Sequence, residues 1–154
     1  MIQRKQTVFL FLGALISLVC LCMPLGYYID TTNHALGQQH QLFNLWIANA
    51  EGGHDYSVCP LALVLFVAMD MAVYNIFLFK NRMVQSKICL FNILLIIGWY
   101  AVLALYTFVL NDGMGTFKPG FALILPAVSL ILYVMARKAI LADEALVRAA
   151  DRIR

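Results

Sequence analysis

Asp70 is the residue whose type and position most directly suggest chemistry in this chain. It is an acidic residue near the middle of a long apolar run, residues 58–79. A carboxylate at the centre of a bilayer costs about 2.5–3.5 kcal/mol on insertion scales, so such residues usually have a function or are tightly paired. One interpretation is a proton or cation site for transport. The other, which we favour because nothing else in the apolar runs resembles a substrate path, is packing within an intramembrane polar site made of Asp70, Tyr74, Asn92, Tyr100 and Tyr133.

Three of the four cysteines could support redox chemistry. Cys20, Cys22 and Cys59 lie near the same ends of two apolar runs, on the side where oxidising conditions permit disulfides. Electron transfer from thiols to a quinone by a four-helix membrane protein requires a reactive Cys-x-x-Cys pair, and this chain has only Cys20-x-Cys22. Because a buried cysteine is more often a small apolar residue, we expect packed thiols.

Histidines and acidic residues gather between residues 29 and 57 and suggest a metal site. They are His34, His40, Glu51, His54 and Asp55. Their spacing matches no ligand pattern, such as two histidines four residues apart on a helix, so we expect a solvated loop without a metal or cofactor. The chain also shows no nucleophile–base pair, no phosphate-binding loop and no nucleic-acid-binding feature. The sequence therefore predicts a protein that is not an enzyme.

Four long apolar runs must position these residues. The chain is 63% hydrophobic and 12% charged, with a mean hydropathy of +0.84, whereas soluble domains carry about 25% charged residues. Each run is long enough, or nearly so, to cross a hydrocarbon layer of ~30 Å. No signal-peptide cleavage site follows the first run, so we expect it to be retained. The prediction is one all-α membrane domain over residues 1–154, a four-helix bundle with spans at about 8–28, 58–79, 88–110 and 120–141.

The distribution of basic residues predicts the orientation. Of the 11 lysines and arginines, only Lys118 lies outside the terminal segments and the short loop between the second and third runs. Because basic loops stay in the cytoplasm, we expect a multi-pass protein of the bacterial inner membrane with both termini cytoplasmic. The segments 29–57 and 111–119 are then outside.

Small and polar residues form stripes along the apolar runs. In lipid such residues mark the packed faces of helices, so the stripes predict the inside of the bundle. The second run has two such faces, so it would touch two neighbouring helices or a partner subunit. We also expect Pro126 to kink the fourth run. The stripes are Gly13, Ser17, Cys20 and Pro24; Ala68, Ala72 and Asn75; Cys59, Asp70 and Tyr74; Asn92, Trp99 and Tyr106; and Ala122, Pro126, Ser129, Tyr133 and Ala136.

The parts outside the runs also carry order signals. The segments 27–29 and 42–47 are apolar and aromatic, which predicts two short strands, or one strand and an interfacial helix, in a small cap. Residues 137–154 keep a helical composition, and Glu144 precedes Arg148 by four residues, so we expect the last helix to continue into the cytoplasm. Candidate contacts on that side are Lys80, Arg82, Arg148 and Arg152.

Several segments of the chain are similar to a known family. They are MIQRKQT at residues 1–7, FKNR at 79–82, and the stretch from ARKAI at 136–140 through DEALVRAADRIR at 143–154. In these the chain resembles a family of small bacterial membrane proteins, typical of Bacteroidota and catalogued as domain of unknown function 4293, and the pattern of spans extends the resemblance over the whole chain. The resemblance implies four spans and no assigned activity.

Our leading hypothesis is an accessory or interaction subunit of a larger membrane assembly. Its partners would be the lipid bilayer and a membrane protein, or further copies of itself. The first alternative is a small proton- or cation-coupled transporter built around Asp70, which a polar cavity reaching that residue would favour. The second is a thiol–quinone oxidoreductase that uses Cys20, Cys22 and Cys59.

Overall fold

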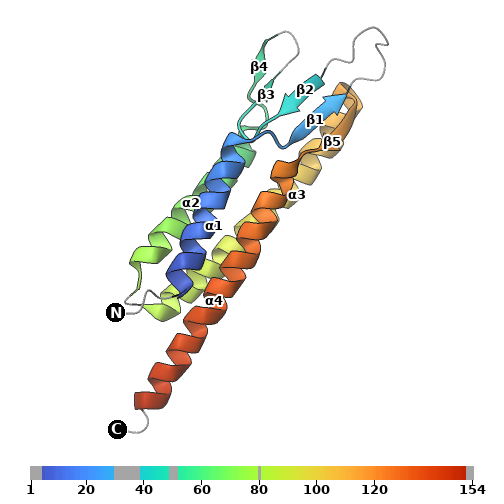
Figure 1. The fold of residues 1–154 in the computed structure, drawn as a ribbon. Helices are drawn as coiled ribbons and strands as arrows, with labels where there is room; N and C mark the ends of the chain where they lie inside the picture. The colour runs from blue at the N-terminus through green and yellow to red at the C-terminus, as the bar shows by residue number, and fades with distance from the viewer. Residues whose placement is uncertain (1–4, 30–38, 49–51, 80, 152–154) are drawn as a thin grey trace.

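The computed structural model describes residues 5–29, 39–48, 52–79 and 81–151. In these residues, four helices are long and apolar enough to cross a membrane. They are α1 (Lys5–Cys22), α2 (Cys59–Phe77), α3 (Arg82–Met114) and α4 (Ile124–Asp151). Each helix packs against two neighbours, so that α1, α2, α3 and α4 follow one another around the bundle (Figure 1).

The two ends of the bundle differ. Helix α1 begins and helix α4 ends at the same end, which we call the open end, and a β-sheet covers the other, which we call the capped end (Figure 1). Helix α4 runs on past the other helices at the open end, as Figure 1 shows. The predicted continuation of the last helix beyond its span is therefore confirmed as far as Asp151.

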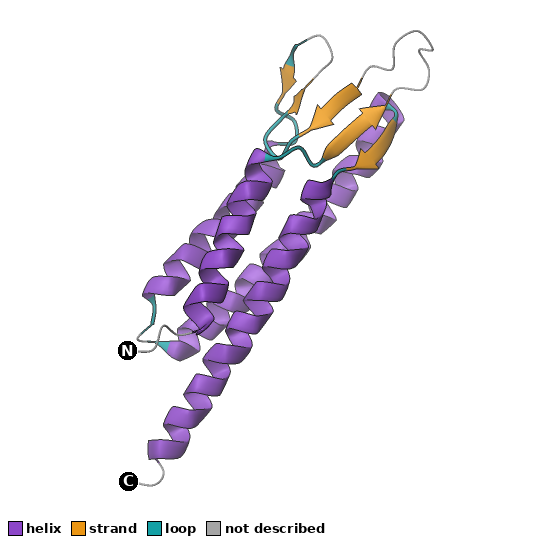
Figure 2. Cartoon of the chain, viewed as in Figure 1, coloured by secondary structure: helices purple, strands orange, loops and turns teal. Residues whose placement is uncertain are grey.

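A five-stranded antiparallel sheet makes the cap (Figure 2), so the all-α prediction holds for the bundle and fails for the cap. Its strand order is β4-β3-β2-β1-β5. The strands are β1 (Gly26–Ile29), β2 (Gln39–Leu42), β3 (Ile47–Ala48), β4 (His54–Asp55) and β5 (Thr116–Pro119). The connection between α1 and α2 carries β1, and the connection between α3 and α4 carries β5. Because these strands pair, the two connections satisfy each other's backbone hydrogen bonds.

Of the two predicted strands, one is present and the other is a turn. The segment 27–29 lies in β1, as predicted. The segment 42–47 instead carries the chain from the end of β2 into β3, and the Phe43 N–H donates to the Trp46 carbonyl at 2.9 Å across that turn. The two aromatic rings lie 5.4 Å apart, so the apolar character of this segment serves packing rather than strand pairing.

Strand β5 lies in the segment 111–119, for which the sequence predicts only a loop. It pairs with β1, where Tyr28 stands opposite Phe117 and the two rings lie 5.1 Å apart. A Cβ atom on Gly26 would lie 2.5 Å from the Lys118 carbonyl oxygen, which no packed structure tolerates. The missing side chain of Gly26 thus lets the two strands approach.

The ends of two helices depart from the predicted spans. Helix α1 ends at Cys22, whereas the predicted span continues to residue 28. Pro24 disfavours a helical conformation in the residue before it, and the chain then enters β1. Helix α3 starts before and ends after the predicted span 88–110.

The predicted stripes form the interior of the bundle, with the exception of one face of α2. Gly13 allows α1 and α4 to approach closely, because a Cβ atom there would lie 2.6 Å from the Tyr133 ring. The hydroxyls of Ser17 and Ser129 both donate to the Gly13 carbonyl, at 2.9 and 3.1 Å. Small and hydroxyl-bearing residues therefore join these helices, as expected for packing in lipid.

Pro126 starts a helix and does not kink one. It lies in the first turn of α4, which begins at Ile124, so its missing N–H interrupts no hydrogen bond in the middle of the helix. The carbonyl four residues earlier, that of Ala122, accepts the thiol of Cys20 at 3.5 Å instead. The polar stripe of α1 thus supplies the donor that the proline lacks.

Candidate functional site

The five residues of the predicted intramembrane polar site do not come together. Asp70 and Tyr74 are exposed on the outer face of α2. Asn92 and Tyr133 are fully buried inside the bundle. The Tyr100 hydroxyl donates to a backbone carbonyl just before α4 begins. The prediction that Asp70 closes the bundle through these side chains is therefore wrong.

The helical period explains why Asp70 points outward. The buried residues of α2 are Leu61, Leu65, Ala68, Ala72 and Asn75. Asp70 is two residues from both Ala68 and Ala72, which places it about 200° around the helix from each at ~100° per residue. Once the alanine face packs against the neighbouring helices, the carboxylate has to lie on the opposite side.

Asp70 lies within a continuous exposed seam on α2. The seam consists of Leu63, Phe66, Asp70, Val73 and Phe77. Successive members are three or four residues apart, which is the spacing of residues that meet a partner helix in a coiled coil. Asp70 is ~16 Å along the helix axis from Cys59 at ~1.5 Å per residue, close to the middle of a ~30 Å hydrocarbon layer. An acidic side chain thus sits at the centre of an otherwise apolar, unpartnered helix face.

A pair of amides joins α2 to α3 inside the bundle, toward the open end. The Asn75 side chain donates to the Gln85 carbonyl at 3.2 Å and to the Cys89 sulfur at 3.1 Å. The Gln85 side chain donates back to the Asn75 carbonyl at 3.1 Å. The stripe analysis identifies Asn75 but misses Gln85, because Gln85 precedes the predicted third span.

Asn92 is the least satisfied polar residue of the bundle. Its side chain is fully buried, and neither its oxygen nor its nitrogen has a hydrogen-bond partner among the described residues. Buried amides of this kind are satisfied by ordered water in proteins. We therefore expect water beside Asn92, within the bundle.

Asn44 joins the cap to three helices. Its side-chain nitrogen donates to the Cys20 carbonyl at 2.8 Å, and its side-chain oxygen accepts the Trp99 indole N–H at 3.2 Å. Its own carbonyl accepts the Ala62 N–H at 3.1 Å. The residue is fully buried. Sequence reasoning misses this role, although a lone amide inside an apolar aromatic segment is a signal that could have found it.

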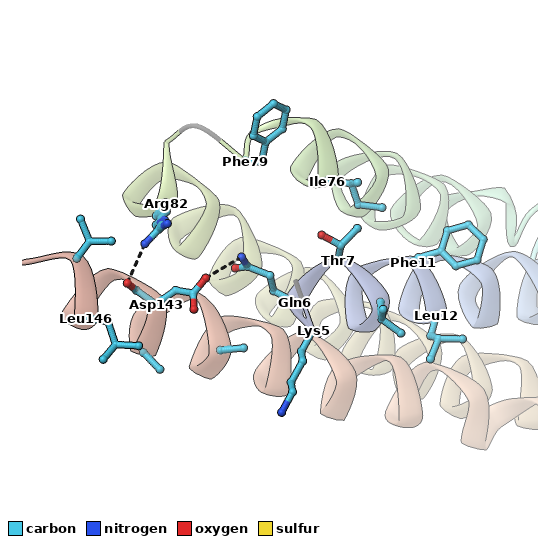
Figure 3. A pocket seen from close by; sticks show the side chains of 14 residues that line it. Lys5, Gln6, Thr7, Phe11, Leu12, Ile76, Phe79, Arg82, Asp143 and Leu146 are labelled. Atoms are coloured by element: carbon cyan, nitrogen blue, oxygen red, sulfur yellow. Dashed lines mark hydrogen bonds between the residues drawn. The ribbon is translucent and has the colours of Figure 1, made fainter. Parts of the chain in front are cut away.

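A second polar cluster lies at the open end, where α1, α3 and α4 meet (Figure 3). The Gln6 side chain, 2% exposed, donates to the Asp143 carboxylate at 3.3 Å. The Arg82 guanidinium donates to the Asp143 carbonyl at 2.8 Å. These residues line a cavity of about 1320 Å³ whose other walls come from α1, α2 and α4. This cavity combines charged groups with apolar walls.

The four predicted cytoplasmic contact residues have different settings. Arg82 is half-buried and turned toward Asp143, so it contributes to the bundle as well as to its surface. Arg148 is exposed and pairs with Glu144 at 2.9 Å, which confirms the interaction expected from their spacing. Lys80 and Arg152 lie outside the residues that the structure describes.

The cysteines are all free thiols. Cys20 and Cys89 are buried, whereas Cys22 and Cys59 are exposed. Of the predicted metal candidates, His34 and Glu51 lie outside the described residues, and His54 and Asp55 form β4. Across the described residues, no three His, Cys, Asp or Glu side chains are placed to hold a metal ion.

Comparison with known families finds one family model that covers nearly the whole chain. The family model described as domain of unknown function DUF4293 matches residues 2–153. The chain belongs to this family. The resemblance inferred from the terminal segments is thus confirmed, while no curated protein matches the chain. The family carries no described activity.

Proposed function

We propose that this protein is an accessory subunit of a membrane assembly, which binds another membrane protein along the exposed seam of α2. It has no catalytic activity of its own in this proposal. It resides in the inner membrane with the open end in the cytoplasm and the cap outside. The common end at which α1 begins and α4 ends supports this orientation, together with the basic residues near it.

The outward position of Asp70 is the observation that carries the proposal. Acidic residues within membrane spans almost always face a bundle interior, a water-filled cavity or a partner. In this chain Asp70 faces away from the bundle, so its own helices provide neither a bundle interior nor a water-filled cavity for it. A partner helix lying along the seam would cover the carboxylate and remove it from lipid.

Charge complementarity indicates what that partner carries. A lysine or arginine at mid-membrane depth on the partner would neutralise Asp70, and its own insertion cost would be offset by the same pair. A second copy of this chain fits less well. The exposed residues that flank Asp70 on α2 include no basic side chain, so a symmetric contact between two α2 helices would oppose two carboxylates. We therefore commit to a different protein with a basic residue in its span.

Photocrosslinking in native membranes tests this proposal. A crosslinking amino acid placed at Phe66 or Val73, on either side of Asp70, should capture one membrane protein, and Asp70→Leu should abolish the capture. The matched control position is Phe108 of α3, which is 77% exposed and lies away from the seam. Reversing the charges, with Asp70→Lys and the partner's basic residue changed to Asp, should restore the capture. Capture of a second copy alone, or capture that does not depend on Asp70, would contradict the proposal.

The orientation has a test of its own. A reporter that is active only outside the cytoplasm should be silent when fused after Arg154 and active when inserted near Gly37. The physical reason is that basic segments such as Arg137 and Lys138 resist translocation. A strong signal from the fusion at Arg154 would reverse the orientation.

The two alternative functions receive less support. A transporter would need Asp70 on a path through the bundle, and the carboxylate lies on its outer surface. The residues that line the open-end cavity do not include it. Thiol–quinone chemistry would need two cysteines that can exchange a disulfide. The thiol of Cys20 is buried and hydrogen-bonded to a carbonyl, which leaves only Cys22 and Cys59 of the three candidates exposed.

A further inference from the structure

The cavity at the open end is the feature that the proposed subunit role leaves unused. It lies where α1 begins, between the last turns of α2 and the part of α4 that runs past the other helices (Figure 3). In the proposed orientation this is the depth of the cytoplasmic head groups. Its volume is about 1320 Å³.

The inner side of this cavity is polar and incompletely satisfied. The Gln6 side-chain oxygen is buried and has no hydrogen-bond partner among the described residues, so it requires a donor. The Asp143 carboxylate accepts one hydrogen bond, from Gln6, and keeps further acceptor capacity. In the part of the chain that the structure describes, the Arg82 guanidinium forms no salt bridge, since its hydrogen bond goes to a backbone carbonyl.

The opposite side of the cavity is apolar and exposed. Val8, Phe11 and Leu12 of α1 line it and are each at least 40% exposed. Ile76 of α2 and Phe79, which follows α2, complete this wall. The α1 residues continue along the helix toward the bilayer, so an acyl chain can follow them from a head group bound at Arg82.

We propose that this cavity binds a phospholipid whose head group carries both a phosphate and a primary ammonium. Arg82 donates to the phosphate oxygens, and the ammonium donates to the Gln6 side-chain oxygen and to the Asp143 carboxylate. Lys5 also lines the cavity, but its side chain points away from Asp143 in Figure 3, so Arg82 is the cation assigned. The proposal does not depend on Asp70 or on a protein partner.

The arrangement of charges distinguishes this lipid from its relatives. A choline head group has the same charges, but its trimethylammonium has no N–H to donate to Gln6 and Asp143. A glycerol head group carries the phosphate without a cation, so the Asp143 carboxylate would stay unpaired beside an anion. Both acceptors therefore select for a primary ammonium.

Native mass spectrometry of the delipidated full-length protein tests the proposal. We expect phosphatidylethanolamine to bind about tenfold more tightly than phosphatidylcholine with the same acyl chains, as hydrogen bonds to charged groups are worth this much. Gln6→Met and Asp143→Asn should each reduce this preference, whereas Arg82→Gln should weaken both lipids alike. Glu144→Gln is the matched control, because this neighbouring carboxylate is paired with Arg148 and should not affect the preference.

Three results would overturn the proposal. The first is equal binding of the two lipids by the unaltered protein, a comparison that needs no variant to fold. The second is a preference that survives both Gln6→Met and Asp143→Asn. The third is displacement of the bound lipid by soluble phosphoethanolamine at the same concentration, which would assign the site to a free phosphate ester.

Discussion

Replacing Asp70 by leucine should have opposite effects on the isolated protein and on its complex. At the centre of a membrane helix, Asp costs about 2.5–3.5 kcal/mol on insertion scales and Leu gains about 0.3–0.6 kcal/mol. Because Asp70 is exposed, the substitution opens no cavity inside the bundle. Snorkelling and local water reduce the difference of ~3–4 kcal/mol, so we expect Asp70→Leu to favour membrane insertion of α2 by about 1–3 kcal/mol without lowering the unfolding free energy of the purified protein.

The same substitution should weaken binding of the partner. Removing one member of a buried, hydrogen-bonded charge pair costs about 2–5 kcal/mol, which corresponds to a loss of affinity of about 30- to 5000-fold. Asp70→Asn keeps the size and much of the hydrogen bonding of the side chain but loses its charge. We therefore expect its affinity for the partner to lie between that of the unaltered protein and that of Asp70→Leu. Asp70→Glu should retain most of the binding.

Separate assays measure these opposite effects. Translocon-mediated insertion of α2 and unfolding of the purified protein by a denaturing detergent report on the isolated chain, and binding to the identified partner in lipid nanodiscs reports on the complex. Ile131→Leu on α4, at a residue that is 57% exposed, is the control that should change neither. A loss of more than about 1 kcal/mol in the isolated Asp70→Leu protein would refute our reasoning, because it would show that Asp70 packs within its own chain.

Three further predictions concern the cap. Asn44→Ala should destabilise the protein by about 1–3 kcal/mol in the same unfolding assay, because it leaves the buried Trp99 indole N–H without a partner. Gly26→Ala should detach β5 and increase proteolysis there, since the new Cβ would collide with the Lys118 carbonyl, while Gly98→Ala serves as a control with open space around it. Burial raises the pKa of Tyr28 to about 12 from a value near 10, so the folded state favours the neutral phenol. The contribution of the neutral Tyr28 phenol to the unfolding free energy should be present below pH ~10 and be lost as the pH rises to ~12. In Tyr28→Phe the unfolding free energy should not show this decrease.

The amino-acid sequence alone determined the helices and most of the buried faces. Hydropathy is a local property, and a helix in lipid satisfies its own backbone hydrogen bonds, so the four spans could be predicted without knowledge of their packing. The stripes that contain Gly13, Ser129 and Tyr133 were also predictable, because small and polar residues recur at the helical period. The family was evident from the terminal segments.

Only the tertiary structure decided the cap and the two candidate sites. Strand β5 exists because it pairs with β1, about ninety residues earlier, and no local pattern encodes a partner so distant. Gln6, Arg82 and Asp143 come from three helices and meet only when the bundle forms. Helix α2 carries two faces with polar residues, and its sequence does not indicate which of them packs inside the bundle. The packing of Ala68 and Ala72 against neighbouring helices turns Asp70 outward, because opposite sides of one helix cannot both face the core.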